Sequence, residues 1–131
     1  RIWNDRFESP LNRLYSHFYY GKLDVDAMKE ACGYFVGEHD FTSFCSAGSQ
    51  VVDKVRTIYS LDVKREDRLI TIRVTGNGFL YNMVRIIAGT LVDIGRGRIT
   101  ENMSTIIKSK SRSMAGHTAP AHGLFLKKVD Y

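Results

Sequence analysis

One segment in the second half of the chain most limits how it can fold. Residues 83–92 are apolar on almost every face of a helix and contain one charged residue, Arg85. A helix that is apolar all round is normally buried, and a guanidinium keeps its charge when it is buried. Such a group needs an anionic partner or several hydrogen-bond acceptors. Arg85 is therefore a candidate for holding an anion or an active-site carboxylate; the alternative is an arginine that reaches solvent or pairs with a local acid.

The residues on either side of this helix predict its limits. Gly76-Asn77-Gly78 forms a turn signal after a predicted strand, and Gly95 is a natural stop for the helix. Asn77 is a good capping residue for the helix start. The predicted helix therefore begins beside a polar turn, where a pocket can open next to the core.

Composition narrows the class of protein. At 131 residues, with 44% apolar and 25% charged content, the chain suits a single soluble domain, residues 1–131. No apolar run reaches the roughly 18 to 20 residues of a membrane span, and no membrane partner is expected. The start has no signal-peptide pattern and no Met, so a fragment of a longer protein is predicted. Cys32 and Cys45 lack zinc-site spacing, which favours free thiols in a cytoplasmic protein.

Charge is distributed unevenly along the chain. Residues 1–67 hold 9 Lys and Arg against 11 Asp and Glu, whereas residues 68–129 hold 10 against 2. A basic half of this kind indicates a polyanionic partner such as a nucleic acid. The alternative is a solvated basic face that aids solubility.

Hydrophobic periodicity predicts an α+β fold, an antiparallel or mixed sheet with helices packed on one face. The first half of the chain is predicted to hold an irregular or extended segment at 1–20, a helix at 25–36 and a loop at 39–49. A hairpin of strands at 51–64 and 69–75 follows, and then the apolar helix. The remaining predicted elements are a helix at 101–108, a loop or a short turn of helix at 111–121, and a strand at 123–129. In the first hairpin strand, the alternation places Thr57, Tyr59, Leu61 and Val63 on one face.

Local patterns of metal binding and catalysis are weak. The four histidines, His17, His39, His117 and His122, lack metal-ligand spacing, so no metal and no cofactor is predicted. His39 and Asp40 could form a polar pair, although a loop anchored by Phe41 and Phe44 is favoured.

Four motifs occur in an order that resembles the tRNA pseudouridine synthase A (TruA-type) family across nearly the whole chain. They are Asp40-Phe41-Thr42-Ser43-Phe44, Arg56-Thr57, Asn77-x-Phe79-x-x-x-Met83-Val84-Arg85-x-Ile87-x-Gly89-Thr90-Leu91, and Ala119-Pro120-Ala121-x-Gly123-Leu124. The third motif combined with the fourth is the most specific part of the match.

The resemblance implies an isomerase that converts uridine to pseudouridine in the tRNA anticodon stem-loop, as a homodimer without an organic cofactor. The family's essential aspartate lies in an Arg-Thr-Asp-Ala-Gly-Val-like motif, which is absent from this sequence. The family's active-site tyrosine is also expected upstream. The chain thus resembles the C-terminal half of the enzyme, half of a pseudouridine synthase fold; the alternative is a stand-alone RNA-binding or dimerisation module without catalysis.

The resemblance also implies roles for individual residues. Arg85 matches the basic residue that pairs with the catalytic aspartate, while Leu124 would line the uracil pocket and Phe79 its floor, with core packing as the alternative for both. Candidate contacts to RNA phosphates are Arg56, Arg73, Arg96, Arg98, Lys108 and Lys110. For Arg56 and Arg73, an exposed strand position without a phosphate contact is the favoured alternative.

Overall fold

The structure is a computed structural model that describes residues 2–4, 17–19, 22–46, 51–66 and 68–120. Its strands are β1 (Ile2–Asn4), β2 (His17–Tyr19), β3 (Gly37–Asp40), β4 (Val55–Glu66) and β5 (Leu69–Gly76). Its helices are α1 (Val25–Cys32), α2 (Met83–Gly95) and α3 (Met103–Ser109), with short 3-10 turns η1 (Thr42–Phe44) and η2 (Arg112–Met114). The strand predicted at 123–129 lies outside the described residues.

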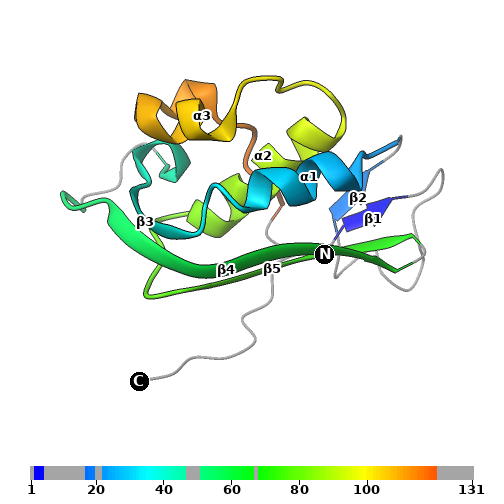
Figure 1. Ribbon diagram of the computed structural model, residues 1–131, viewed down its shortest axis with the longest axis horizontal. Coiled ribbons are helices and arrows are strands. Elements are labelled where there is room, and N and C mark those ends of the chain that lie inside the picture. The colour runs from blue at the N-terminus through cyan, green and yellow to red at the C-terminus, as the bar shows by residue number, and fades with distance from the viewer. Residues whose placement is uncertain (1, 5–16, 20–21, 47–50, 67, 121–131) are drawn as a thin grey trace.

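The strands form one mixed sheet in the order β2-β1-β5-β4-β3. Strands β1 and β2 pair in parallel, whereas the other neighbours are antiparallel. All three helices lie over the same face of the β4–β5 hairpin (Figure 1). The predicted α+β fold, with a mixed sheet and helices on one face, is confirmed.

The hairpin is present, but its first strand does not alternate as predicted. The register of β4 against β5 shifts between Ile58 and Ser60, which leaves Tyr59 in a bulge. Ile58 is 1% exposed and Tyr59 is 60% exposed, the reverse of the predicted faces. One extra residue in a strand moves every side chain on one side of it to the opposite face. Leu61, beyond the bulge, points into the core as expected.

The first helix is shorter than predicted and is followed by a strand where a loop was expected. Helix α1 ends at Cys32, and the chain then turns so that Phe35 is fully buried. Residues 37–40 form β3 because they pair with the start of β4. The sequence Gly-Glu-His-Asp has no strand pattern of its own, so only pairing with a distant neighbour decides its conformation.

The apolar helix is confirmed as α2, but the predicted cap is wrong. Asn82, in a left-handed conformation, precedes the helix. The Oδ1 atom of Asn77 instead accepts a hydrogen bond from the backbone N–H of Thr57 at 2.9 Å. The N–H of Asn77 also donates to the carbonyl of Thr57 at 3.0 Å, so Asn77 closes the end of the hairpin. Helix α3 begins two residues later than expected because Asn102 caps it by accepting from Ser104 N–H at 2.8 Å.

The loop after β3 is anchored by aromatic side chains, as favoured. Phe41 and Phe44 are fully buried, and Phe44 makes an edge contact with Phe35 at a centroid separation of 5.1 Å. His39 and Asp40 do not bond to each other: the ring of His39 contacts the carbonyl of Val36, and Asp40 accepts hydrogen bonds from Thr42. This loop leads to Ser46, which lies beside the start of α2.

Both cysteines are free, as predicted, and the structure buries both of them. Burial, and to a smaller degree the negative charge of Asp62, raises the pKa of the Cys32 thiol to about 11. Since the thiolate is the reactive form of cysteine, Cys32 is an inert core residue.

Candidate active site

The side chain of Arg85 is half-buried near the start of α2 and is held from two sides. Its Nε donates to the carbonyl of Ala119 at 2.7 Å, and its Nη1 donates to Oδ1 of Asn82 at 3.1 Å. Both acceptors are neutral, and no carboxylate pairs with this guanidinium in the described part of the chain. The arginine therefore keeps its full positive charge while its direction is set by two fixed groups.

The guanidinium has donors left over for another group. A guanidinium carries five N–H donors, and two of them are used by Ala119 and Asn82. The remaining three, on Nη1 and Nη2, have no acceptor among the residues that the structure describes. Two adjacent amino groups of an arginine are the fork that binds both oxygens of a carboxylate. The site can therefore accept one carboxylate or phosphate in addition to its present partners.

The segment that supplies the Ala119 carbonyl packs directly against the backbone of α2. The N–H of Ala119 donates back to the carbonyl of Arg85 at 3.0 Å. A Cβ atom added to Gly89 would lie 1.7 Å from the carbonyl oxygen of His117, so only a glycine permits this approach. The close packing places Ala119 within reach of the arginine one helical turn away.

The far end of α2 holds the same segment through a second charged residue. Asp93 is 4% exposed, and its Oδ2 accepts from the backbone N–H of His117 at 3.2 Å and lies 3.0 Å from the Nδ1 of that ring. Its Oδ1 lies 3.1 Å from Nε of Arg96, an ion pair without hydrogen-bond geometry. One turn earlier, Thr90 accepts from the N–H of Gly116 at 2.9 Å. The segment is thus fixed to α2 at both ends.

Phe79 and Arg56 lie beside the loop that precedes α2. Phe79 is 40% exposed, and its ring covers Gly76, where an added Cβ would lie 3.3 Å from a ring carbon. A Cβ atom added to Gly78 would lie 3.8 Å from the Arg56 side chain. The Nη1 of Arg56 donates to the carbonyls of Asp53 and Val55. Phe79 therefore lies on the loop that leads to Arg85, and Arg56, in β4, packs against that loop at Gly78. Leu124, the other predicted pocket residue, lies outside the described residues.

Comparison with known proteins supplies the family. The family described as tRNA pseudouridine synthase matches residues 31–131. The chain belongs to the tRNA pseudouridine synthase family.

Curated relatives match along the whole chain. It is 51% identical over 132 residues to tRNA pseudouridine synthase A of Anoxybacillus flavithermus, covering 100% of this chain and 53% of the relative. It is 46% identical over 131 residues to the protein of that name from Bacillus subtilis, which covers 99% of this chain and 53% of the relative. It is 47% identical over 131 residues to that of Clostridium acetobutylicum, covering 99% and 54%. The chain thus spans about half the length of the curated relatives it matches.

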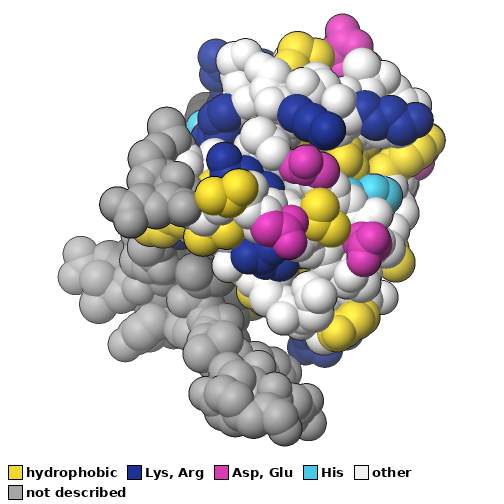
Figure 2. Space-filling view, turned by 90° about the vertical axis from the view of Figure 1, so that its left-hand side faces the viewer, with side chains coloured by type: hydrophobic (Ala, Val, Ile, Leu, Met, Phe, Trp, Pro, Cys, Tyr) yellow, Lys and Arg dark blue, Asp and Glu magenta, His cyan; other side chains and the backbone are white. Residues whose placement is uncertain are grey.

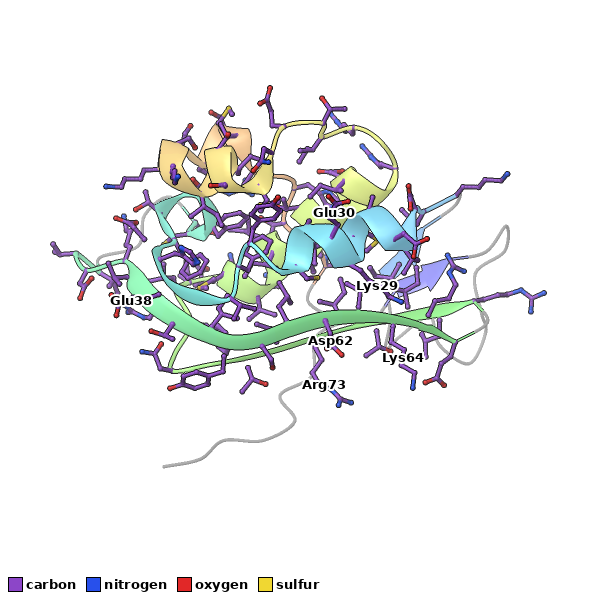
Figure 3. All side chains as sticks on the ribbon, viewed as in Figure 1. Lys29, Glu30, Glu38, Asp62, Lys64 and Arg73 are labelled. Carbon is purple, nitrogen blue, oxygen red and sulfur yellow. The ribbon has the colours of Figure 1, made fainter. Side chains whose placement is uncertain are left out.

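In this member of the tRNA pseudouridine synthase family, the predicted phosphate-binding residues are not gathered into one patch. Arg73 points away from the helices on the outer face of the sheet, near its register partner Asp62 (Figure 3). Arg96 follows the far end of α2, roughly 16 Å along the helix axis from Arg85 at 1.5 Å per residue. On the end of the molecule drawn in Figure 2, basic, acidic and hydrophobic side chains are intermixed.

Two of the predicted basic residues already have an acidic partner. Arg96 pairs with Asp93, and Nζ of Lys110 lies 3.8 Å from Oδ2 of Asp40. Arg98 and Lys108 are exposed, and no carboxylate pairs with either within the described ranges. None of the helices in those ranges is both long enough and apolar enough to cross a membrane.

Sequence reasoning missed the residues that hold Arg85. Asn82 precedes Arg85 by three positions, the spacing of neighbours on a helix face, so the sequence carried a usable signal for it. The Oγ of Ser46 accepts from Nδ2 of Asn82 at 2.9 Å across 36 positions, and the Ala119 carbonyl lies 34 positions from Arg85. No local pattern indicates either of these contacts.

Proposed function

We propose that this chain is part of an enzyme that isomerises uridine to pseudouridine in the anticodon stem-loop of tRNA. The observation that carries the proposal is the guanidinium of Arg85, which is held by Ala119 and Asn82 and keeps three N–H donors for a further partner. That partner is the nucleophilic aspartate, supplied by another part of a longer protein. The length of the relatives supports this arrangement, because the chain covers 53% of the first of them.

Arg85 acts on the aspartate in two ways. A positive charge at contact distance lowers the pKa of a carboxyl group, so the aspartate is ionised at neutral pH. The two amino groups also bind both carboxylate oxygens in parallel, which fixes the direction of the nucleophile. The ionised aspartate attacks the target nucleoside, and the C–N glycosidic bond breaks. The uracil rotates and its C5 bonds to the sugar, after which the bond to the aspartate breaks, C5 loses its proton to water and N1 gains one.

Other residues make the proposed contacts to substrate. Phe79, with 40% of its surface exposed on the loop before α2, forms the floor of the uracil pocket, and Leu124 lines it. The predicted phosphate-binding residues, chiefly Arg96, Arg98, Lys108 and Lys110, contact the phosphates of the tRNA. The whole protein acts in the cytoplasm as a homodimer, and neither a metal nor an organic cofactor takes part.

Tritium release from tRNA that carries uridine tritiated at C5 tests the proposal, because isomerisation exchanges that hydrogen with water. We expect release by the full-length protein and none by purified residues 1–131, since the chain holds no matching nucleophile. Transcripts whose anticodon-stem uridines are replaced by cytidine serve as the control and should release nothing above background.

Each other outcome has a distinct meaning. Turnover by the isolated chain would place the nucleophile within residues 1–131 and overturn its assignment to another part. A full-length protein that binds the stem-loop without releasing tritium would instead be an RNA-binding module.

A further inference from the structure

Asn82 has a backbone conformation that few residues adopt. Its φ is 59° and its ψ is 11°, in the left-handed region, where Lys110 is the only other non-glycine residue of the described chain. Asparagine tolerates this region better than most residues because its short side chain bonds locally. Glycine adopts it at no steric cost, so the backbone alone does not explain an amide at this position.

The amide of Asn82 also does not serve the helix that it precedes. A residue at this position usually accepts a hydrogen bond from an N–H of the first helical turn, but the side chain of Asn82 makes no such bond. Instead it forms a bridge. Its Nδ2 donates to Oγ of Ser46 at 2.9 Å, and its Oδ1 accepts from Nη1 of Arg85 at 3.1 Å.

This bridge ties the guanidinium to a second, distant element. Ser46 follows η1, and its backbone N–H donates to the carbonyl of Tyr81 at 3.2 Å, so Ser46 is itself held against the residue before Asn82. On the other side of the guanidinium, Nε is held by Ala119. The two supports act on different nitrogens, and together they determine which N–H groups remain available.

We propose that Asn82 is a positioning residue: its amide, anchored by Ser46, orients the Arg85 guanidinium so that its unused N–H donors face the nucleophilic carboxylate. The inference rests on the proposed function. It also explains why a neutral amide is required. An amide oxygen fixes the arginine without cancelling its charge, whereas a carboxylate in the same place would occupy the guanidinium permanently.

Two substitutions at position 82 separate positioning from a purely structural role. Asn82→Gly keeps the left-handed backbone and removes the bridge, while Asn82→Asp keeps the shape and the contact but adds a negative charge beside Arg85. Both variants of the full-length protein should lower kcat at least about tenfold, as expected when a charged group in an active site is misaligned or neutralised. KM and the Kd for tRNA should stay within about twofold of the wild type, because Asn82 acts on the chemical step.

The pH profile of kcat gives a readout that a loss of stability would not move. Weaker interaction with Arg85 raises the pKa of the nucleophilic carboxyl, so the acid limb of the profile should move to higher pH in both variants. Ser46→Ala removes the anchor of the bridge. It should lower kcat and move the acid limb to higher pH, each by a smaller amount than the substitutions of Asn82. Asn102→Ala is the matched control: it removes the cap of α3 and lowers stability, but should leave the limb unmoved.

Arg85→Met, measured in parallel, separates failure of this inference from failure of the proposed function. If Arg85→Met abolishes turnover while Asn82→Asp keeps the wild-type kcat and pH profile, Asn82 only supports the loop and the inference is wrong. If Arg85→Met itself retains near-normal turnover, the role proposed for Arg85 fails and the role of Asn82 fails with it. Asn82→Asp preserves the backbone preference and the contact, so this comparison holds even where Asn82→Gly unfolds the protein.

Discussion

Helix α2 carries two charged residues, and the protein uses them in opposite ways. Arg85 and Asp93 lie eight residues apart, about 12 Å along the helix, and both contact the segment that contains His117 and Ala119. Arg85 is half-buried, and three of its five N–H donors have no acceptor within the described residues. Asp93 is 4% exposed, and both of its carboxylate oxygens face a partner, either His117 or Arg96.

Asp93 and Arg85 differ in whether groups of this chain neutralise their charge. A buried charge is tolerated where hydrogen bonds and opposite charges replace its hydration. Asp93 meets that condition within this chain, so its partners account for its burial. Arg85 meets it only in part, through neutral acceptors that leave its charge uncompensated, which favours a role in binding a further anion.

The largest expected effect is the loss of turnover when Arg85 is replaced. In the full-length protein, Arg85→Met should lower kcat by roughly a thousandfold, equivalent to about 4 kcal/mol of transition-state stabilisation. Arg85→Lys keeps the charge but loses the planar fork, so it should lower kcat severely but less than Met does. Tritium release from tRNA measures both, and a filter-binding Kd should change little.

The fold of the chain should survive these replacements. Methionine suits an apolar helix, although the Ala119 carbonyl and the Asn82 amide each lose a donor, which costs about 1 to 3 kcal/mol. Circular dichroism of residues 1–131 checks this point. Near-normal turnover of Arg85→Met would make Arg85 a packing residue and remove the distinction between the two ends of α2.

Asp93→Asn should show the opposite pattern, with a loss of stability and little change in turnover. The asparagine oxygen can still accept from His117, but the ion pair with Arg96 is lost, so the free energy of unfolding should fall by about 1 to 3 kcal/mol. Urea unfolding of residues 1–131 measures the change. A kcat reduced tenfold or more at unchanged stability would show that Asp93 belongs to the catalytic machinery.

The salt dependence of RNA binding compares free basic residues with paired ones. In single-stranded regions, each phosphate that the protein no longer neutralises should reduce the slope of log K against log salt by about 0.7. Removing the charges of both Arg98 and Lys108 should therefore reduce this slope by about 1.4. The same change at Arg96 and Lys110 should have a smaller effect, because each already pairs with an acid. Binding that is insensitive to salt and to all four substitutions would refute the polyanion interpretation.

The smallest effect is expected at Asp40. The hydroxyl of Thr42 is the main cause that holds the pKa of Asp40 below its ordinary value; burial opposes this, while the Thr42 N–H, Lys110 and Lys54 add to it. A lowered folded-state pKa stabilises the protein above the unfolded pKa, and that stability is lost as pH falls through the folded value.

Asp40→Asn should therefore lower the free energy of unfolding at neutral pH by less than about 1 kcal/mol, since the side chain is 34% exposed and solvent screens it. The difference from the wild type should shrink as pH falls through the lowered folded-state pKa of Asp40. Urea unfolding at neutral and at acid pH measures it, and a difference that grows at acid pH would contradict the assigned direction.

Strong local patterns were enough to predict the main elements. The apolar run around Arg85 predicted α2, and alternation with a polar turn predicted the hairpin, since these signals depend only on side-chain periodicity. Two predictions were wrong where pairing between strands decides the conformation. Strand β3 forms only because it pairs with β4, and the bulge at Tyr59 reverses the faces of the strand before it.

By itself, the sequence determined that a charged arginine would lie in an otherwise apolar helix, because apolar periodicity and the permanent charge of a guanidinium are properties of the residues. Only the tertiary structure decided which groups hold that charge. Ser46 and Ala119 reach Arg85, directly or through Asn82, from positions more than thirty residues away. Such contacts depend on how Ser46 and the segment at 116–119 pack beside α2, and the direction of the guanidinium is therefore set only when the chain is folded.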